Sequence, residues 1–312
     1  MSDFSALHRA GDPLILPNVW DVASARCLVE AGFRALGTTS LGVAAAAGLP
    51  DGAGATAAET LRLTRNLAKL PVHLTVDIET GSVGAAVAVA EAGAAGVNME
   101  DAMGPAEAHA ALLRSVKREL PQLFVNARTD TYWQRPGDLA ETLRRVRRYA
   151  DAGADGVFVP GLAEPTDIAA VVAAVDVPVN ILFLPGQHTI ADLSQLGVRR
   201  ISTGSLLFRA ALAACADTAL AVRDGLAVRP DLPSYSQINA WSPPGDTVTD
   251  ERSRTCRALP TPAWGSDLVA GKANSARSLR GCDGRRKGHI VALRRRDAGP
   301  GRRSDTAASW LP

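Results

Sequence analysis

The sequence predicts a (β/α)8 barrel, and three observations favour this fold class over an open, doubly wound sheet. Short, β-branched strands alternate with amphipathic helices along about 215 residues. The segments that join a helix to the next strand look alike, since EAGFRAL, EAGAAGV, DAGADGV and QLGVRRI each place Gly directly after a helix. Polar and acidic residues gather where the strands end, which is the edge at which barrels carry their sites.

Eight strands and eight helices are expected in strict alternation. The first strand is predicted over Leu14–Asn18 and the first helix over Asp21–Ala31. The seven further strands are expected at Ala35–Thr39, Val72–Ile78, Gly96–Met99, Leu123–Thr129, Gly156–Pro160, Val179–Leu184 and Arg200–Thr203. The seven further helices are expected at Ala57–Lys69 (capped by Thr56), Val83–Ala92, Glu107–Glu119, Asp138–Ala152, Glu164–Ala174, Thr189–Leu196 and Leu206–Arg223.

The bulk properties fit a chain with a substantial core. A length of 312 residues with 46% hydrophobic composition suffices for one large α/β domain. No run of 18 apolar residues occurs, and the start MSDFSALHRAGD lacks the pattern of a signal peptide, so we expect a cytoplasmic protein without membrane contact. The four cysteines show no CxxC spacing, which argues against a zinc site or a disulfide scaffold.

Charge is distributed unevenly along the chain. From Glu251 onward there are 14 Lys and Arg against 5 Asp and Glu, whereas the preceding 250 residues contain 20 and 27. We therefore predict a barrel domain over residues 1–240 and a low-complexity, disordered tail over residues 241–312. Basic runs such as Arg294–Arg296 would suit nucleic acid, but a solvated tail without such a partner is the favoured interpretation.

Two consecutive predicted strands end in pairs of acids. Asp77 and Glu79 lie at the end of VHLTVDIETG, and Glu100 and Asp101 lie in GVNMEDA. Four carboxylates held together at one edge of a barrel repel one another unless protons or a cation intervene. Magnesium prefers a few carboxylate oxygens together with several waters, so the pattern indicates a Mg2+ site. The alternative is that some of these acids cap the following helices, most plausibly Glu79 and Asp101.

Other strand ends add groups that suit an anionic substrate. A planar guanidinium such as that of Arg128 can hold a carboxylate through two parallel hydrogen bonds. Its alternative role is a structural ion pair with Asp130 or Glu100. Asn180 can contact a substrate or simply cap the next loop, and Thr38 and Thr39 can equally be ordinary strand residues.

Several motifs, taken together, resemble the isocitrate lyase/phosphoenolpyruvate mutase superfamily. They are PNVWDVASARCLVEAGFRALGTTSLGVAAAAGLPDG, VDIETG, GVNMEDA, VNARTDTYW, GADGVFVPG and LGVRRISTGSLLFRAAL, in this order. The resemblance covers roughly Pro13 to Ala240. It implies a barrel of the phosphoenolpyruvate mutase type that binds Mg2+, or alternatively Mn2+, and stabilises the enolate of an α-keto acid. It also implies a homo-oligomer, a dimer or a tetramer, in which the final barrel helix is exchanged between neighbours.

The same resemblance assigns roles to individual residues. Asp77 matches the family's direct metal ligand and Glu79 a second acid at the metal, while Asp51 and Glu100 match acids that hold its waters. We therefore predict metal ligands Asp77, Glu79 and Glu100; catalytic residues Arg128, Glu100 and Asp51; and substrate contacts Thr38, Thr39, Ser40, Arg128 and Asn180. The expected partner is a small dicarboxylate or keto acid.

Departures from the family pattern narrow the expected reaction. Residues 102–107 contain no Cys, Lys or His, although lyases of the superfamily carry a catalytic cysteine in this loop, and Gly37 and Pro160 also differ from better-known members. We therefore expect a Mg2+-dependent lyase that decarboxylates an α-keto acid, as an oxaloacetate decarboxylase does. A methylisocitrate lyase-like or phosphonopyruvate/carboxyphosphonoenolpyruvate mutase-like enzyme, or a degenerate barrel that only binds such acids, are the alternatives. The third β/α unit is also about half a dozen residues shorter than in relatives, which predicts a crossover helix of only about 15 Å.

Overall fold

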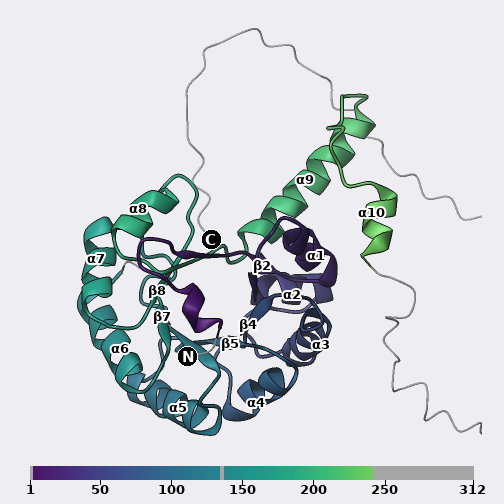
Figure 1. The fold of residues 1–312 in the computed structure, drawn as a ribbon. Coiled ribbons are helices and arrows are strands. Elements are labelled where there is room, and N and C mark those ends of the chain that lie inside the picture. The colour runs from purple at the N-terminus through teal and green to yellow at the C-terminus, as the bar shows by residue number, and fades with distance from the viewer. Residues whose placement is uncertain (1–2, 134–136, 242–312) are drawn as a thin grey trace, which may run out of the picture. The chain divides into compact units, whose positions relative to one another are not determined.

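The computed structural model describes residues 3–133 and 137–241, and it confirms the predicted barrel (Figure 1). Every strand pair is parallel, and the order β1-β9-β8-β7-β6-β5-β4-β3-β2 closes on itself because β1 (Leu14–Leu16) and β2 (Asn18–Val19) are two halves of the predicted first strand. Pro17 separates them, since it has no N–H to donate to a ladder. The first half pairs with β9 and the second with β3.

The remaining strands lie close to their predicted ranges. They are β3 (Ala35–Thr38), β4 (His73–Asp77), β5 (Gly96–Glu100), β6 (Phe124–Arg128), β7 (Gly156–Phe158), β8 (Val179–Leu182) and β9 (Arg200–Ser202). The best-paired neighbours are β5 and β6, which run in register from Gly96 opposite Phe124 to Glu100 opposite Arg128. This register brings Glu100 and Arg128 to the same height at the C-terminal edge of the sheet.

Helices surround the sheet in the predicted order. They are α1 (Val22–Glu30), α3 (Ala57–Leu67), α4 (Val83–Glu91), α5 (Ala106–Glu119), α6 (Leu139–Asp151), α7 (Pro165–Ala173), α8 (Ile190–Gln195) and α9 (Leu206–Arg223). Two helices were not predicted, α2 (Ser40–Ala47) and α10 (Tyr235–Ala240), and a short 3-10 helix, η1 (Ser5–Leu7), precedes the barrel. The alanine-rich α2 lacks an apolar stripe, so the periodicity on which the other predictions rest gives no signal there.

Glycines end four of these helices as the sequence predicted. Gly32, Gly93, Gly153 and Gly197 adopt φ values of +90°, +104°, +96° and +86°. After α1, Gly32 N donates to Val29 O and Phe33 N donates to Leu28 O, which is the Schellman pattern. The same pair of bonds recurs after α4, α6 and α8. Each motif turns the chain directly into the next buried strand.

The short third unit still completes its crossover. Helix α4 has nine residues, yet β4 and β5 pair in register from Thr75 opposite Gly96 to Asp77 opposite Asn98. Small residues make this possible: an added Cβ on Gly93 would lie 2.7 Å from Ala68 Cβ. The end of α4 therefore lies very close to the end of α3, and the acids at the ends of β4 and β5 remain adjacent.

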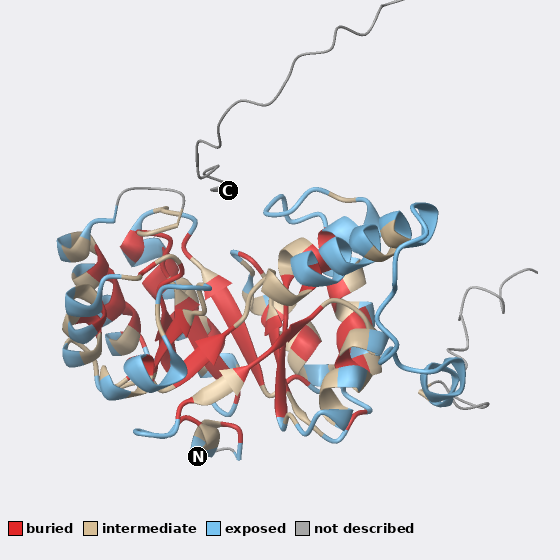
Figure 2. Cartoon of the chain, turned by 90° about the horizontal axis from the view of Figure 1, so that it is seen from above, coloured by how far each residue is buried: buried red, intermediate tan, exposed pale blue. Residues whose placement is uncertain are grey.

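The buried residues form the barrel wall and the layer beneath the helices, as Figure 2 shows. The N-terminal segment closes one end of the barrel. Phe4 is fully buried against Phe124, and the ring of His8 stacks on Phe124 with centroids 4.5 Å apart. Access to the interior is therefore expected from the opposite end, where the strands finish.

The predicted tail lies almost wholly outside the described residues, which stop at Trp241. The boundary at residue 240 and the disorder of residues 241–312 therefore stay predictions. Within residues 3–133 and 137–241, no helix is long and apolar enough to cross a membrane.

Candidate active site

Asp77 ends β4 and is positioned by its own backbone. Its N–H donates to Thr38 Oγ1 at 2.8 Å, and its Oδ1 accepts the N–H of Glu79 at 3.1 Å. Burial raises the pKa of Asp77; the nearby Arg128 opposes this rise, and the carboxylate of Asp51 adds to it. Thr38 thus acts on Asp77 through a hydrogen bond, and it remains a predicted substrate contact.

Glu79 is buried and holds a loop in place. Its backbone is left-handed, with φ of +55°, a conformation that a residue other than glycine keeps only when its surroundings fix it. Its carboxylate accepts the N–H of Gly54 at 2.8 Å and the hydroxyl of Thr56 at 2.9 Å. Thr56 is the N-cap residue of α3, as predicted, but its hydroxyl donates to Glu79 and makes no hydrogen bond to the first turn of the helix.

Glu100 and Arg128 form the centre of the cluster. Arg128 Nη1 lies 2.9 Å from Glu100 Oε2, and Arg128 Nε donates to Asp130 Oδ1 at 2.6 Å. The guanidinium also faces the rings of Trp133 and Phe158 at 5.8 and 6.0 Å from their centroids. These contacts form the structural ion pairs that were the alternative for Arg128.

The pKa values of Glu100 and Arg128 are both shifted from their ordinary values. Burial raises the pKa of Glu100 to about 7, with a further contribution from Asp77, although Arg128 lowers it. The pKa of Arg128 is itself raised: burial opposes its charge, but Asp130 and Glu100 outweigh burial. Asp77, Glu100 and Asp130 therefore outnumber Arg128 at this edge.

The remaining predicted site residues lie around this edge. Asp51 is exposed on the loop that Glu79 holds, and it is close enough to affect the pKa of Asp77. Thr39 is buried and Ser40 half-buried at the start of α2. Asn180 is buried on β8, and neither atom of its side-chain amide has a hydrogen-bond partner among the described residues.

Asp101 has a structural role. Its carboxylate accepts hydrogen bonds from Arg145 Nη1 and Tyr149 Oη, both at 2.7 Å, and from the N–H groups of Met103 and Asp130. Burial works against its charge, but these bonds hold the pKa of Asp101 below its ordinary value. Asp101 thus belongs to a fixed network behind the site, and it orders the loop that follows β5.

That loop offers no acid or base to the site. Ala102 and Met103 have left-handed backbones, held by the bond from Met103 N to Asp101 and by Gly104 N donating to Asp101 O at 2.7 Å. Glu107, its sole titrating side chain, is exposed on α5 and pairs with Arg114 and Arg148. The absence of a lyase-type Cys, Lys or His is therefore not compensated by Glu107.

The donor set fits Mg2+. Asp77 and Glu100 are hard oxygen donors whose pKa values are raised chiefly by burial, although Arg128 lowers both. Within the described residues, no three His, Cys, Asp or Glu side chains converge as a metal cage made only of protein would require. Mg2+ usually keeps several waters and needs only one or two direct carboxylates, so this looser arrangement suits it.

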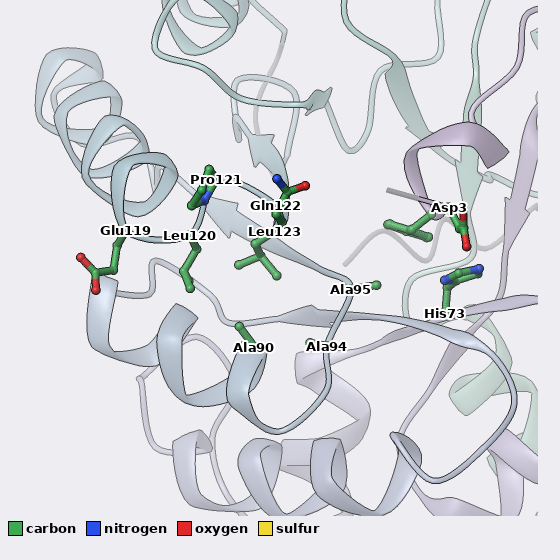
Figure 3. A pocket seen from close by; sticks show the side chains of 11 residues that line it. Asp3, His73, Ala90, Ala94, Ala95, Glu119, Leu120, Pro121, Gln122 and Leu123 are labelled. Atoms are coloured by element: carbon green, nitrogen blue, oxygen red, sulfur yellow. The ribbon is translucent and has the colours of Figure 1, made fainter. Parts of the chain in front are cut away.

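Among the described residues, one cavity lies beside the acids and a larger one lies remote from them. A cavity of about 320 Å3 opens between α3 and α4, beside Asp77 and Glu79, where the third unit is short. The larger one, of about 510 Å3, is lined by Asp3, His73, Glu119 and neighbouring apolar residues (Figure 3). It lies at the N-terminal end of the strands, where barrels do not carry catalytic groups.

Sequence reasoning missed Arg200. This residue begins β9 and is 1% exposed, and its Nη2 donates to Asn98 Oδ1 at 3.1 Å. A signal was present: Arg199 and Arg200 are consecutive where β9 begins, and alternation sends one of two successive side chains to the interior. The hydroxyl of Thr56 and the N–H of Gly54, which hold Glu79, left no such signal.

Comparisons with known proteins agree with this architecture. The family described as phosphoenolpyruvate phosphomutase matches residues 4–223. An uncharacterized protein of Mycobacterium tuberculosis is 45% identical over 247 residues, which cover 76% of this chain and 95% of that protein. A crystal structure from Burkholderia cenocepacia is 36% identical and covers 71% of this chain and 96% of that chain, with a TM-score of 0.66.

Further relatives carry names of enzymes. The 2-methylisocitrate lyase of Bacillus subtilis is 32% identical over 195 residues, 56% of this chain and 64% of that protein. The oxaloacetate decarboxylase of Pseudomonas savastanoi is 27% identical over 272 residues, 78% of this chain and 92% of that protein.

Proposed function

Because the chain belongs to the phosphoenolpyruvate mutase/isocitrate lyase superfamily, whose members are lyases and mutases that act on small acids, we propose that it is a Mg2+-dependent decarboxylase of a small α-keto acid, with oxaloacetate as the model substrate. The observation that carries the proposal is the under-neutralised edge formed by Asp77, Glu100 and Arg128.

Asp77 and Glu100 would hold the ion, Asp77 directly and Glu100 through water. When bound there, Mg2+ acts as a Lewis acid that polarises the keto group and stabilises the negative charge of an enolate. Glu79 keeps the loop of Asp51 beside Asp77 through its bonds to Gly54 and Thr56. Mn2+ is the alternative ion, since it accepts the same oxygen donors.

Arg128 would bind the carboxylate that the product retains. In the decarboxylation of a β-keto diacid, the bond between C3 and the departing carboxylate breaks, and its electron pair stays on the remaining three carbons as an enolate. One proton from water then completes pyruvate. This route needs no residue to deprotonate a substrate hydroxyl, which matches the loop of residues 102–107, where Glu107 faces solvent.

Cleavage of an isocitrate-like acid is the second candidate, favoured by the relative named 2-methylisocitrate lyase. It requires a base for the substrate hydroxyl and an acid for the product enolate, each typically contributing about 10²- to 10⁴-fold in rate. Neither group is present in the loop after β5. A barrel that binds such acids without turnover is the remaining candidate.

The test is a screen for pyruvate release from 2-oxo and 2-hydroxy diacids, with and without Mg2+. We expect Mg2+-dependent release from oxaloacetate above the rate of Mg2+ alone. Asp77→Ala should abolish it together with thermal stabilisation by Mg2+, while the exposed Asp176→Ala, at the opposite end of the barrel, should behave as the parent.

Full activity or unchanged Mg2+ binding in Asp77→Ala would refute the assignment of Asp77. Robust cleavage of isocitrate or 2-methylisocitrate by the parent would favour the second candidate. Binding of oxalate in the presence of Mg2+, without any turnover, would favour the degenerate barrel.

We further propose that α9 packs on a second copy of the chain. Phe208, which meets Trp20, is its only buried residue among the 18 described, and Leu212, Leu220 and Val222 are 46–66% exposed. Figure 1 shows α9 pointing away from the ring of helices α1 to α8. Sedimentation should show a dimer or tetramer, and Leu212→Glu with Leu220→Glu should shift it toward the monomer; a monomeric parent would refute the exchange.

A further inference from the structure

The side chain of Arg200 lies across the axis of the barrel. It begins on β9, and its Nη2 reaches Asn98 Oδ1 on β5 at 3.1 Å. In the closed sheet, three strands separate β9 from β5 in either direction, since β1 and β2 count as one. The two residues therefore stand on opposite walls, and the guanidinium spans the space between them.

This guanidinium is short of partners. Its Nε and Nη1 are buried and have no hydrogen-bond partner in the part of the chain that the structure describes, and no carboxylate there lies within ion-pair distance. Burial lowers the pKa of Arg200 to about 9, opposed by Asp77. A buried charge is costly unless it is paired, which makes Arg200 unlike Arg128 and Arg145, each bound by two carboxylates.

Neighbouring polar groups share this shortage. Asn180 is the register partner of Arg200 on β8, and both atoms of its amide are unpaired. Ser202 and Thr75, whose hydroxyls are also unpaired, follow the same interior faces of β9 and β4. We call these four residues the axial cluster. Buried polar groups almost always have partners, so such a concentration implies an occupant.

The chemistry of the axial cluster selects an anion. A guanidinium, an amide and two hydroxyls offer mainly N–H and O–H donors, with one positive charge and no carboxylate among them. The cluster also lies close to the acids, because Asn98, which Arg200 contacts, is the register partner of Asp77 on the neighbouring strand. The distance between adjacent strands, about 4.7–4.9 Å, is comparable with the length of a four-carbon diacid.

We propose that Arg200, with Asn180, binds a distal carboxylate of the substrate, and that the site therefore selects four-carbon diacids over acids that lack this distal carboxylate. This inference rests on the proposed function, in which the first carboxylate and the keto group face Mg2+ and Arg128. Arg200 acts here as a specificity-determining residue. Its charge is left unpaired in the free protein and is matched when a dianionic substrate arrives.

The experiment compares two unreactive acids in the presence of Mg2+, using calorimetry on the full chain. Oxalate is too short to reach past the metal, whereas malate carries a distal carboxylate. In Arg200→Met we expect malate to bind about 10- to 100-fold more weakly, the effect of one lost charged hydrogen bond, and oxalate to change less than about threefold. The neighbouring Arg199→Met, just before β9 and only partly buried, should bind both acids as the parent does.

A second variant and a second measurement separate a loss of binding from a loss of folding. Arg200→Lys retains the charge and should recover part of the malate affinity. The melting temperature of Arg200→Met without ligand should be equal to or above that of the parent, because an unpaired buried charge has been removed.

The possible failures are distinguishable. A parent that binds neither acid with Mg2+ overturns the proposed function and this inference with it. A parent that binds both, with affinities that Arg200→Met leaves unchanged or weakens equally, overturns the inference alone.

Discussion

Glu100 and Asp101 are consecutive residues at the end of β5, yet their environments are opposite. Asp101 accepts hydrogen bonds from Arg145, Tyr149 and two backbone N–H groups, and its pKa is lowered. Glu100 shares one cation, Arg128, with Asp130, and its pKa is raised to about 7. The carboxylate of Asp101 is therefore stabilised by hydrogen bonds within the protein, whereas that of Glu100 has only a shared cation.

The difference separates a structural acid from a functional one. A carboxylate with every acceptor filled stabilises the fold and has nothing left for a ligand. A carboxylate kept short of positive charge is costly to the free protein, and a cation that relieves it binds with that free energy. The alternative that Asp101 caps the following helix is wrong, because Pro105 is the N-cap residue of α5 and Asp101 binds Arg145 and Tyr149 instead. Glu100 stays a predicted metal ligand.

The largest expected effect concerns Asp101. Asp101→Asn leaves the buried Arg145 with Glu141 as its remaining counter-charge, and the loss of a charged hydrogen bond there typically costs about 1.5–3 kcal/mol of unfolding free energy. Urea unfolding measures it, and affinity for Mg2+ should stay within about twofold for the folded protein. Glu107→Gln, which breaks an exposed pair with Arg148, is the matched control and should cost less than about 1 kcal/mol. If Asp101→Asn is as stable as the parent but no longer binds Mg2+, Asp101 is the functional acid and not the structural one.

Arg128→Ala is the next largest. The variant removes the guanidinium from both Glu100 and the substrate carboxylate, so KM for oxaloacetate should rise by about 10- to 100-fold. If the clamp binds substrate and transition state alike, kcat should change little. Steady-state kinetics at saturating Mg2+ provide the measurement, and a fall in kcat with an unaltered KM would show that Arg128 acts on the reaction itself.

Glu100 should make stability depend on pH. In the unfolded chain its carboxyl ionises near 4.5, but in the folded protein only near 7, so the folded state loses stability as pH rises from 4.5 to 7. Without Mg2+, the parent should lose on the order of 1–2 kcal/mol relative to Glu100→Gln between pH 5 and pH 8. If the difference in unfolding free energy between the two proteins is the same at pH 5 and at pH 8, the raised pKa of Glu100 is contradicted. Added Mg2+ should reduce the difference.

The smallest expected effect concerns Glu79, which combines features of the structural acid Asp101 and the functional acid Glu100. Thr56→Val removes one hydrogen bond to its carboxylate, worth about 0.5–1.5 kcal/mol, and loosens the loop of Asp51. If Glu79 mainly fixes this loop, affinity for Mg2+ should fall only a few-fold and Glu79→Gln should behave similarly. A loss of Mg2+ binding in Glu79→Gln but not in Thr56→Val would instead make Glu79 a direct ligand, as the family resemblance implies.

The sequence by itself determined the barrel, the order of its elements and the edge at which the acids meet. These features follow from local properties: apolar periodicity defines strands and helices, glycine after a helix fixes the turn, and parallel strands must end on one side. It failed at α2, where alanine packs on any face, and at Pro17, which divides one strand into β1 and β2.

Only the tertiary structure decided which polar groups are partners. Arg145 reaches Asp101 from 44 residues away, and Arg200 crosses the barrel to Asn98 from 102 residues away. Alternation along a strand says that a side chain points inward, but the choice of partner depends on register and on the diameter of the closed sheet. The tertiary structure therefore decides whether a carboxylate has partners within the protein or lacks positive charge. Glu100 and Asp101, which are adjacent in sequence, show this most directly.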